Sequence, residues 1–331
     1  MRIVQFQDAD GQCRIGIVSD DGEEIHRVAT FTSTYEAALA AADSGASLQD
    51  LLAAEREPDA LDYAALLTAR RIISPLTHPE PARLLVTGTG LTHIGSADAR
   101  NKMHLIGHSE ADDSDSIKIF RAGLAGGKPD AGRIGVQPEW FFKGVGTCVV
   151  APGAPLPLPA FAMAGAEEAE IAGLYVIDRH GRPCRIGYAL GNEYSDHVTE
   201  GMNYLYLAHS KLRACSIGPE LLLGDLPDEV RGTSRILRNG VTIWEEEFLS
   251  GEQHMSHSIA NLEHHHFRYD MFRRPGDLHV YFFGAAIMSY ASGIATQAGD
   301  EFEIASALFG KPLRNRMEAA AATSPIAVTK L

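Results

Sequence analysis

The sequence is poor in the features that mark secreted and membrane-spanning proteins. Its four cysteines, Cys13, Cys148, Cys184 and Cys215, form no Cys-x-x-Cys pair, so neither a disulfide framework nor a zinc site is indicated. No apolar run reaches the roughly 18 residues that a membrane-spanning helix requires. Residues 1–6 alternate like a strand and lack the apolar core of a signal peptide. We therefore expect a cytoplasmic protein with reduced thiols.

Positive charge is also scarce. Lysine and arginine number 29 against 43 aspartate and glutamate residues, which gives a net charge of −14. Without a basic stripe, the chain is not expected to bind nucleic acid or an anionic membrane surface. The remaining composition, 45% hydrophobic and 22% charged, is that of an ordinary globular protein. An acidic protein that binds an anionic small molecule needs a local positive centre, such as a metal ion beside Lys143 or Lys211.

The length of 331 residues allows two domains or one domain with an appendage. Residues 1–75 are predicted to form a small β-rich support domain. In it, Ser33-Thr34-Tyr35-Glu36 has the pattern of a capping box, and Ser47 has that of a second helix start. Its strands are expected near residues 2–6, 14–18 and 24–28. Prolines at 75, 79 and 81 indicate a linker, so residues 76–331 are predicted to form the catalytic domain.

A predicted β-hairpin within residues 166–203 has acidic residues at both ends. Two β-prone runs, Ile171–Ile177 and Ile186–Leu190, are separated by a turn that contains Gly181 and Pro183. If Ile177 pairs with Ile186, Glu170 lies opposite Glu193. Glu168 stands two residues before Glu170, so their side chains share one face of the strand about 7 Å apart.

Three carboxylates on one face would repel one another unless a cation lies among them. Oxygen ligands without accompanying His or Cys favour a hard ion, Mg²⁺ first and Mn²⁺ or Ca²⁺ next. The alternative is an exposed acidic hairpin end without a metal. A slip of one residue in the register would move Glu193 to the other face and remove it from the site.

Three further stretches have less specific patterns. Residues 84–108 read as a strand, a tight turn at Gly88-Thr89-Gly90 and then a helix. Residues 109–135, acidic and then rich in glycine, are expected to form a mobile loop, either a substrate lid or a plain surface insertion. The run His264-His265-His266 is interpreted as structural or exposed, because adjacent helical residues point in different directions.

The acidic hairpin and the motifs around it resemble the fumarylacetoacetate hydrolase superfamily. Members carry Glu-x-Glu before an aliphatic strand and Asn-Asp-x-Ser-Ala-Arg-Asp after the next strand; residues 168–172 and 192–197 match these, with Glu193 for the Asp and His197 for the Arg. Further matching pieces follow in order: 140–143, 151–153, Lys211 with 218–219, 238–240, 275–277, 299–300 and 313–315. The resemblance implies an α+β, mainly β fold, a mixed β-roll with a small N-terminal β domain, and a homodimer.

The resemblance also implies roles for single residues. Metal ligands would be Glu168, Glu170 and Glu193, with Lys211 directed at the substrate. His93 corresponds to the His of a His-x-x-Glu pair that acts in hydrolysis, but Ser96 stands where the Glu should be. The implied substrate-binding residues are Lys143, Ser195, Gly284 and Ala285. Ala285 lacks the hydroxyl that the superfamily has at that position, so a contact there would come from the backbone.

Ser96 weakens the case for hydrolysis, because the partner that would tune His93 is missing. The Asn-Glu-x-Ser-Asp-His variant and the Ala-His-Ser-Lys-Leu-Arg sequence around Lys211 resemble a branch that dehydrates 2-keto-3-deoxy sugar acids in non-phosphorylating pentose catabolism. Such an enzyme would convert a 2-keto-3-deoxy-pentonate to 2-oxoglutarate semialdehyde with Mg²⁺ bound. Lys211 would be the C3 base or stabilise the enolate, and His93 or His197 would protonate the departing hydroxyl.

Two other functions remain open from the sequence. One is an acylpyruvate hydrolase or oxaloacetate decarboxylase, which would need a substitute partner for His93. The other is a non-catalytic protein that binds a sugar acid through the same metal. The small-molecule partner in each case is a 2-keto acid.

Overall fold

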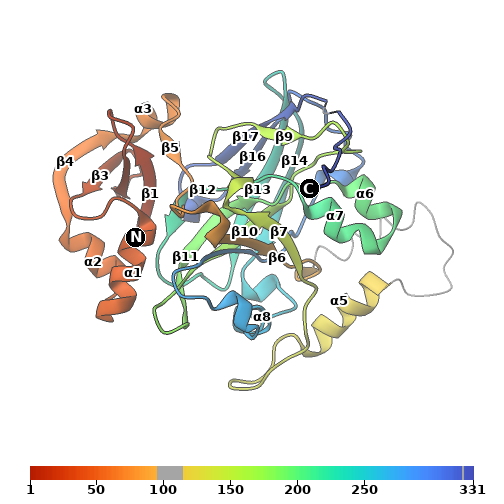
Figure 1. Ribbon diagram of the computed structural model, residues 1–331, viewed down its shortest axis with the longest axis horizontal. Coiled ribbons are helices and arrows are strands. Elements are labelled where there is room, and N and C mark those ends of the chain that lie inside the picture. Colours follow the sequence, from red (N-terminus) through yellow and green to blue (C-terminus); the bar gives the residue numbers. More distant parts are fainter. Residues whose placement is uncertain (95–114, 323) are drawn as a thin grey trace.

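The computed structural model describes residues 1–94, 115–322 and 324–331. Two β-sheets form its centre (Figure 1). The larger sheet has twelve strands, with the order β4-β3-β2-β1-β12-β11-β10-β15-β6-β7 and with β5 and β8 attached to β1 and β12. The smaller sheet has five strands in the order β14-β13-β16-β17-β9. The predicted class, α+β and mainly β, is confirmed.

The strands of the larger sheet are β1 Arg2–Gln7, β2 Cys13–Val18, β3 Glu24–Val28, β4 Arg56–Asp62, β5 Ile72–Ile73, β6 Leu84–Gly88, β7 Phe141–Val145, β8 Val149–Val150, β10 Ala169–Ile177, β11 Pro183–Asn192, β12 Cys215–Leu222 and β15 Leu278–Phe282. Those of the smaller sheet are β9 Leu156–Leu158, β13 Val230–Arg238, β14 Val241–Ser250, β16 Glu301–Ala305 and β17 Leu313–Ala319. The α-helices are α1 Thr34–Ser44, α2 Leu48–Ala54, α3 Tyr63–Thr68, α5 Asp115–Gly126, α6 His197–Met202, α7 Leu207–Lys211 and α8 Ile259–Phe267.

The N-terminal strands and helices lie beside the rest of the molecule, at the left of Figure 1. The three predicted strands are present as β1, β2 and β3, and both predicted helix starts are confirmed. Ser33 caps α1 by accepting a hydrogen bond from the amide of Glu36 at 3.3 Å, and Ser47 caps α2. Because β1 pairs with β12, the larger sheet continues from this part into the remainder of the chain. The domain boundary after residue 75 stays a prediction.

Strand β10 lies inside the larger sheet, between β11 and β15, and every one of its residues is buried. Ala172, Leu174 and Val176 belong to the hydrophobic cluster on one face of the strand. Ile171 and Tyr175 belong to the cluster on the other face. A strand covered on both faces reads as a continuous apolar run, as this one does. Burial on both sides fixes the strand that carries Glu170 and the residues just before it.

The predicted hairpin is confirmed, but its predicted register is wrong. Ile177 pairs with Pro183, three residues from the predicted Ile186. A bulge beside Leu174 shifts the pairing, so Glu170 pairs with Gly191, two residues from the predicted Glu193. The turn is tight because the carboxylate of Asp178 accepts hydrogen bonds from the amides of His180 at 2.9 Å and Arg182 at 2.8 Å. In this register Ala169 pairs with Asn192, so Glu193 stands opposite Glu168 and not opposite Glu170.

A two-residue turn, Asn239-Gly240, joins β13 and β14, and both of its residues have positive φ, as that turn requires. Residues 109–135 are not simply a loop, because α5 occupies Asp115–Gly126. Its glycine at position 123 packs closely against His257, and a methyl group there would lie 2.7 Å from that ring. Residues 109–114 of the predicted lid lie outside the described residues.

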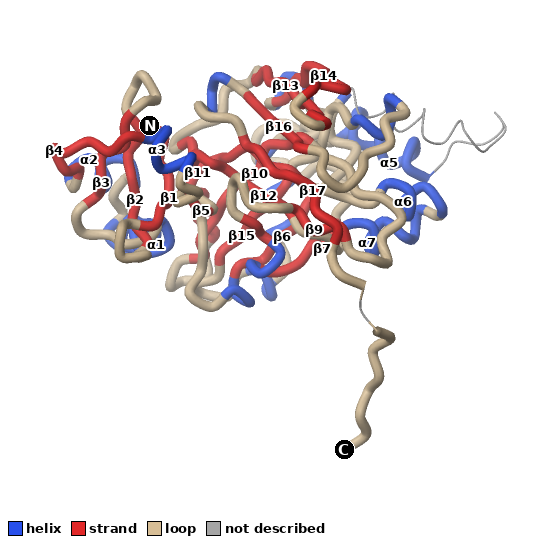
Figure 2. Tube along the Cα trace, turned by 90° about the horizontal axis from the view of Figure 1, so that it is seen from above, coloured by secondary structure: helices blue, strands red, loops and turns tan. Residues whose placement is uncertain are grey.

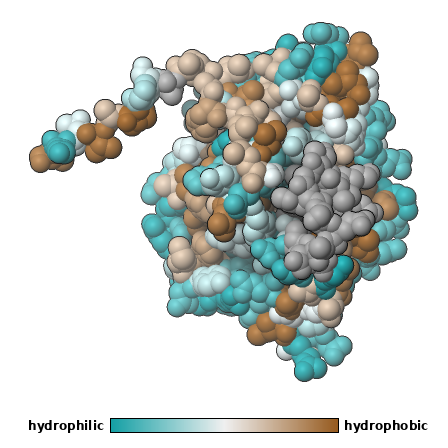
Figure 3. Space-filling view, turned by 90° about the vertical axis from the view of Figure 1, so that its right-hand side faces the viewer, coloured by the Kyte–Doolittle hydropathy of each residue, from teal (hydrophilic) through white to brown (hydrophobic). Residues whose placement is uncertain are grey.

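The C-terminal segment 324–331 extends away from the body of the molecule (Figures 2 and 3). Its apolar residues Ile326, Val328 and Leu331 are exposed. Among the described residues, no helix is long and apolar enough to cross a membrane.

Candidate functional site

The three predicted metal ligands meet at the end of the β10–β11 hairpin. Glu168, Glu170 and Glu193 each place a carboxylate oxygen within 4.8 Å of the others, and all three side chains are buried. The amide of Glu193 donates to the carbonyl of Glu168 at 3.0 Å, so the two chain segments remain paired up to the cluster. The error of two residues in the register did not change this outcome, because a shift by two keeps each side chain on its face of the sheet.

Two buried lysines offset part of this negative charge. Lys211, at the end of α7, donates to Glu168, to Glu193 at 2.6 Å and to the hydroxyl of Ser195 at 3.1 Å. Lys143, on β7, donates to the carboxylate of Glu193 and to its carbonyl oxygen at 2.6 Å. Burial lowers the pKa of Lys211, but the charges of Glu168 and Glu193 outweigh it, so the net shift of its pKa is upward. In this arrangement Lys211 is an ammonium ion.

Glu170 is the carboxylate without a charged hydrogen-bond partner. One of its oxygens accepts a hydrogen bond from the amide of Gly284 at 2.6 Å, while the other is buried and, within residues 1–94, 115–322 and 324–331, has no hydrogen-bond partner. Burial and the charges of Glu168 and Glu193 raise its pKa well above the ordinary value. A buried carboxylate oxygen without a partner, aimed at two further carboxylates, fits a site for a hard cation such as Mg²⁺.

His197, the first residue of α6, supports one of these carboxylates. Its Nε2 lies 2.9 Å from an oxygen of Glu168, and the ring is buried. Burial lowers the pKa of His197, but the hydrogen bond and the charge of Glu168 outweigh it, so the pKa is raised. A second set of potential ligand atoms, from Glu168, His197 and Glu200, also lies within 4.8 Å of one another.

His93 lies one step away from the carboxylates. Its Nε2 is 2.8 Å from the hydroxyl of Ser250, and its Nδ1 is 3.1 Å from that of Thr92. Thr92 in turn donates to the carbonyl of Phe283, the residue before Gly284. Burial lowers the pKa of His93 to about 3, so its imidazole is neutral near pH 7. Ser96, on which the argument against hydrolysis depended, lies outside the described residues.

The structure thus brings together most of the residues chosen from the sequence. The carboxylate cluster, its lysines, Ser195, His197 and the amide of Gly284 are joined by direct hydrogen bonds. Ala285 follows Gly284 and is buried. His93 is connected to the cluster through Thr92 and the carbonyl of Phe283. The role of each residue in catalysis or binding stays a prediction.

Sequence reasoning missed three residues beside the cluster. The carboxylate of Glu167 accepts hydrogen bonds from the amide of Ser289 at 2.9 Å and from its hydroxyl at 2.8 Å. The ring of Tyr290 stacks on that of His197, with 5.4 Å between the centroids. The position of Glu167 directly before Glu168 was an available signal, but nothing local marks residues more than a hundred positions further along.

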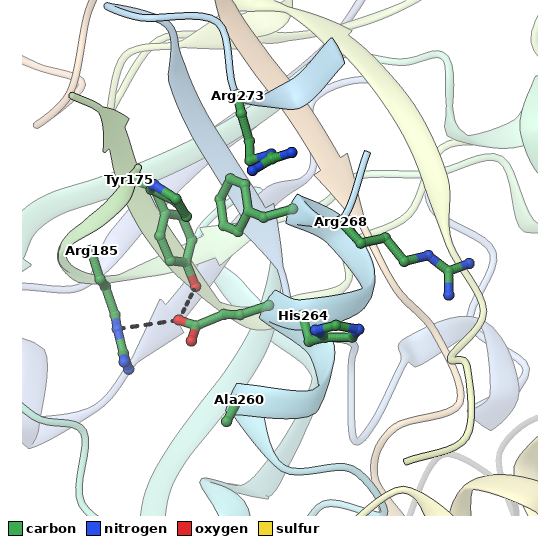
Figure 4. Close-up of a pocket in the computed structure, with 9 residues that line it drawn as sticks. Tyr175, Arg185, Ala260, His264, Arg268 and Arg273 are labelled. Carbon is green, nitrogen blue, oxygen red and sulfur yellow. Dashed lines mark hydrogen bonds and ion pairs between the residues drawn. The ribbon is translucent and has the colours of Figure 1, made fainter. Parts of the chain in front are cut away.

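A cavity of about 480 Å³ lies at the other end of β10, around Tyr175 (Figure 4). There Glu263 accepts a hydrogen bond from the hydroxyl of Tyr175 at 2.8 Å and pairs with Arg185 at 3.2 Å. Five residues along a strand separate Tyr175 from Glu170, which is roughly 17 Å. Since three arginines, Arg185, Arg268 and Arg273, line this cavity beside the one carboxylate of Glu263 (Figure 4), its chemistry is unlike that of the glutamate cluster.

No family model matches the chain. Among curated proteins, a stretch of 117 residues is 32% identical to a probable 2-keto-3-deoxyxylonate dehydratase of Haloferax volcanii. The matched part is 33% of this chain and 38% of that protein, so the chain matches well under half of its curated relative.

Solved structures match over nearly the whole chain. A 2-keto-3-deoxy-D-arabinonate dehydratase complexed with magnesium and 2,5-dioxopentanoate aligns with a TM-score of 0.69 at 20% identity, covering 97% of this chain and 99% of that one. A 5-carboxymethyl-2-hydroxymuconate delta-isomerase from Mycobacterium smegmatis aligns with a TM-score of 0.57 at 17% identity, covering 97% and 100%. At these identities the likeness shows a shared fold.

Proposed function

We propose that this chain, which has the fold of the fumarylacetoacetate hydrolase superfamily, is a metal-dependent dehydratase of a 2-keto-3-deoxy sugar acid such as a 2-keto-3-deoxy-pentonate. The observation that carries the proposal is the buried cluster of Glu168, Glu170 and Glu193 with Lys211 among its oxygens. Two similarities support it: the short sequence match to a probable dehydratase and the fold shared with a dehydratase bound to magnesium and 2,5-dioxopentanoate.

The same three glutamates are the residues that would hold Mg²⁺, or Mn²⁺ in its place. Glu170 is the strongest argument, since one of its buried oxygens has no hydrogen-bond partner among the residues that the structure describes. A divalent ion there would act as a Lewis acid on the carboxylate and keto oxygens of a 2-keto acid, which makes the C3 proton easier to remove.

The chain's own groups then divide the remaining tasks. Lys211 is held by three hydrogen bonds at the carboxylate cluster and is an ammonium ion there, so we assign it to the negative charge that develops when the C3 proton leaves. It would take up the C3 proton itself only if the positive charge of a bound ion lowered its pKa. Lys143 donates hydrogen bonds to the carboxylate and carbonyl of Glu193 and to the carbonyl of Tyr194. Because these bonds engage its amino group, we propose that Lys143 holds the metal ligand Glu193 in place and does not bind the substrate. This changes the role that the sequence gave to Lys143.

The departing C4 hydroxyl needs a proton donor. Of the two histidines considered, His197 contacts the cluster directly, and His93 is a neutral imidazole held by Ser250. We therefore propose that His197 donates the proton to the C4 hydroxyl. His93 would support the side of the site beside Gly284 through Thr92 and Phe283. The overall reaction removes one water from the sugar acid and leaves a double bond between C3 and C4. A proton then leaves C5 while C3 takes one up, and the resulting C4–C5 enol takes up a proton at C4 and loses its hydroxyl proton to give the aldehyde at C5.

The test is a panel of substrates incubated with purified protein and Mg²⁺. A 2-keto-3-deoxy-pentonate that loses one water, detected by mass, would support the dehydratase. Carbon–carbon cleavage of an acylpyruvate, or decarboxylation of oxaloacetate, would refute it in favour of those activities. Binding without turnover of any compound would identify a sugar-acid-binding protein. Glu170→Gln is the matched control, because it keeps the size of the side chain and removes the charge.

We further propose that the enzyme is a cytoplasmic homodimer. The cysteines of the chain are all free, which suits a reducing compartment. Light scattering coupled to gel filtration measures the assembly, and a monomer would refute the dimer.

A further inference from the structure

A further buried glutamate, Glu167, lies directly before the candidate ligand Glu168 and takes no part in the carboxylate cluster. Both of its oxygens are engaged by Ser289, one by the backbone amide and one by the hydroxyl. Glu167 and Ser289 are both buried, and 122 positions separate them in the chain. Burying a carboxylate costs free energy unless the carboxylate is hydrogen-bonded or paired with a charge. These two bonds tie the segment that follows β15 to the beginning of β10.

The residue after Ser289 is in contact with the site. The ring of Tyr290 lies against that of His197 at a centroid distance of 5.4 Å and an angle of 27°. His197 points its Nε2 at Glu168, 2.9 Å away. Direct contacts and one peptide bond therefore connect Glu167 through Ser289, Tyr290 and His197 to Glu168, which is the next residue in the chain after Glu167.

Tyr290 also lines a cavity of about 430 Å³, together with Ala166, Val198 and further small and apolar residues. Because the ring borders this cavity, its position depends on the backbone that Glu167 holds through Ser289. If that backbone moved, the imidazole of His197 would lose its stacking partner and become free to rotate away from Glu168.

We propose that Glu167 and Tyr290 are positioning residues that hold His197 in the orientation in which it orients Glu168 for the metal ion. The inference rests on the proposed function only in taking Glu168 as a metal ligand. Replacing a residue that orients a metal ligand without contacting the ion typically changes metal affinity by about 10- to 100-fold. A purely structural role would change stability and leave the affinity for the ion unchanged.

The experiment measures binding of Mn²⁺ alone to metal-free protein, from the signal of free Mn²⁺ in electron paramagnetic resonance. Tyr290→Ala is expected to weaken binding about tenfold or more. Tyr290→Phe keeps the ring and is expected to restore the affinity. Glu167→Ala is expected to weaken binding similarly, while Glu167→Gln, whose amide can still accept from the Ser289 amide and donate to its hydroxyl, is expected to restore it. Tyr206→Ala is the matched control, since it removes a tyrosine that contacts His209 elsewhere.

The outcomes separate this inference from the proposed function, because no substrate is present. Wild-type affinity in a folded Tyr290→Ala protein would overturn the positioning role even if Glu167→Ala failed to fold. Equal losses in Tyr290→Ala and Tyr290→Phe would also overturn it, since the ring would not be what matters. The expected pattern in a protein that dehydrates no sugar acid would support the inference and refute the proposed reaction.

Discussion

Glu170→Gln is expected to have opposite effects on stability with and without a divalent ion. In the metal-free protein one oxygen of Glu170 is buried without a partner, beside two further carboxylates. Leaving such a group unsatisfied costs about 1–3 kcal/mol, and more when it is charged. Glutamine keeps the hydrogen bond from the Gly284 amide and removes the charge. The variant should therefore be more stable than the wild type by about 1–3 kcal/mol in the presence of a chelator.

Adding the ion should reverse the order. A ligand at a concentration of about 1,000 times its dissociation constant stabilises the native state by about 4.1 kcal/mol, which exceeds the advantage of the variant, and the variant would forgo most of that gain. Urea unfolding at constant pH, with chelator and with saturating Mg²⁺, measures both differences.

A paired carboxylate provides the control for this prediction. Asp300 is buried and receives two hydrogen bonds from Arg238, at 2.8 and 2.9 Å. Asp300→Asn should destabilise the protein by about 1.5–3 kcal/mol under both conditions, because it breaks charged hydrogen bonds far from the cluster. A Glu170→Gln protein that is less stable than the wild type without metal, or that is stabilised by Mg²⁺ as strongly as the wild type, would refute the reasoning.

Three further predictions concern neighbouring groups. Lys211→Met removes the buried cation that Glu168 and Glu193 share, so it should cost about 3–5 kcal/mol in urea unfolding and lower kcat by at least about 100-fold. A kcat within about tenfold of wild type would count against the role of Lys211. Burial lowers the pKa of His279 to about 4, so its contribution to the free energy of unfolding is complete above about pH 6.5 and is lost as the pH falls toward 4. At about 1.36 kcal/mol per pH unit, acidification to pH 5 should cost the wild type about 2 kcal/mol that His279→Leu does not lose. Equal losses in the two proteins would contradict this prediction. Gly284→Ala would place a methyl group 2.2 Å from the hydroxyl of Thr92 and move the amide that holds Glu170, so Mn²⁺ binding should weaken about tenfold. Gly240→Ala is the control, because Gly240 also has a positive φ, +79°, but lies in open space. This control should not change Mn²⁺ binding.

The local parts of the structure were predictable because their signals are local. Caps at Ser33 and Ser47, the Asn239-Gly240 turn and the apolar strand β10 each depend on residues a few positions apart. The register of the hairpin was not predictable to the residue. The carboxylate of Asp178 closes a tighter turn than the glycine and proline pattern indicated, and the bulge beside Leu174 adds a second shift.

The prediction of the carboxylate cluster was correct despite the wrong register, because side chains on a strand alternate between its faces with a period of two. The contacts that support the cluster could not be found in the same way. His93 meets Ser250 across 157 positions, and Glu167 meets Ser289 across 122. Such pairs depend on how the two sheets and the segment after β15 come together, and no spacing within the sequence records this. The helix α5 was missed because acidic and glycine-rich composition outweighed its weak amphipathic pattern.

The most direct test of the central claim is proton NMR of a 2-keto-3-deoxy-pentonate in D₂O with the protein, followed once with Mg²⁺ and once with chelator. A site that removes the C3 proton and expels the C4 hydroxyl predicts an aldehyde signal and deuterium at C3, both only when Mg²⁺ is present. Substrate that keeps its C3 protons and its hydroxyl in the presence of Mg²⁺, with a protein shown to bind the ion, would contradict the claim.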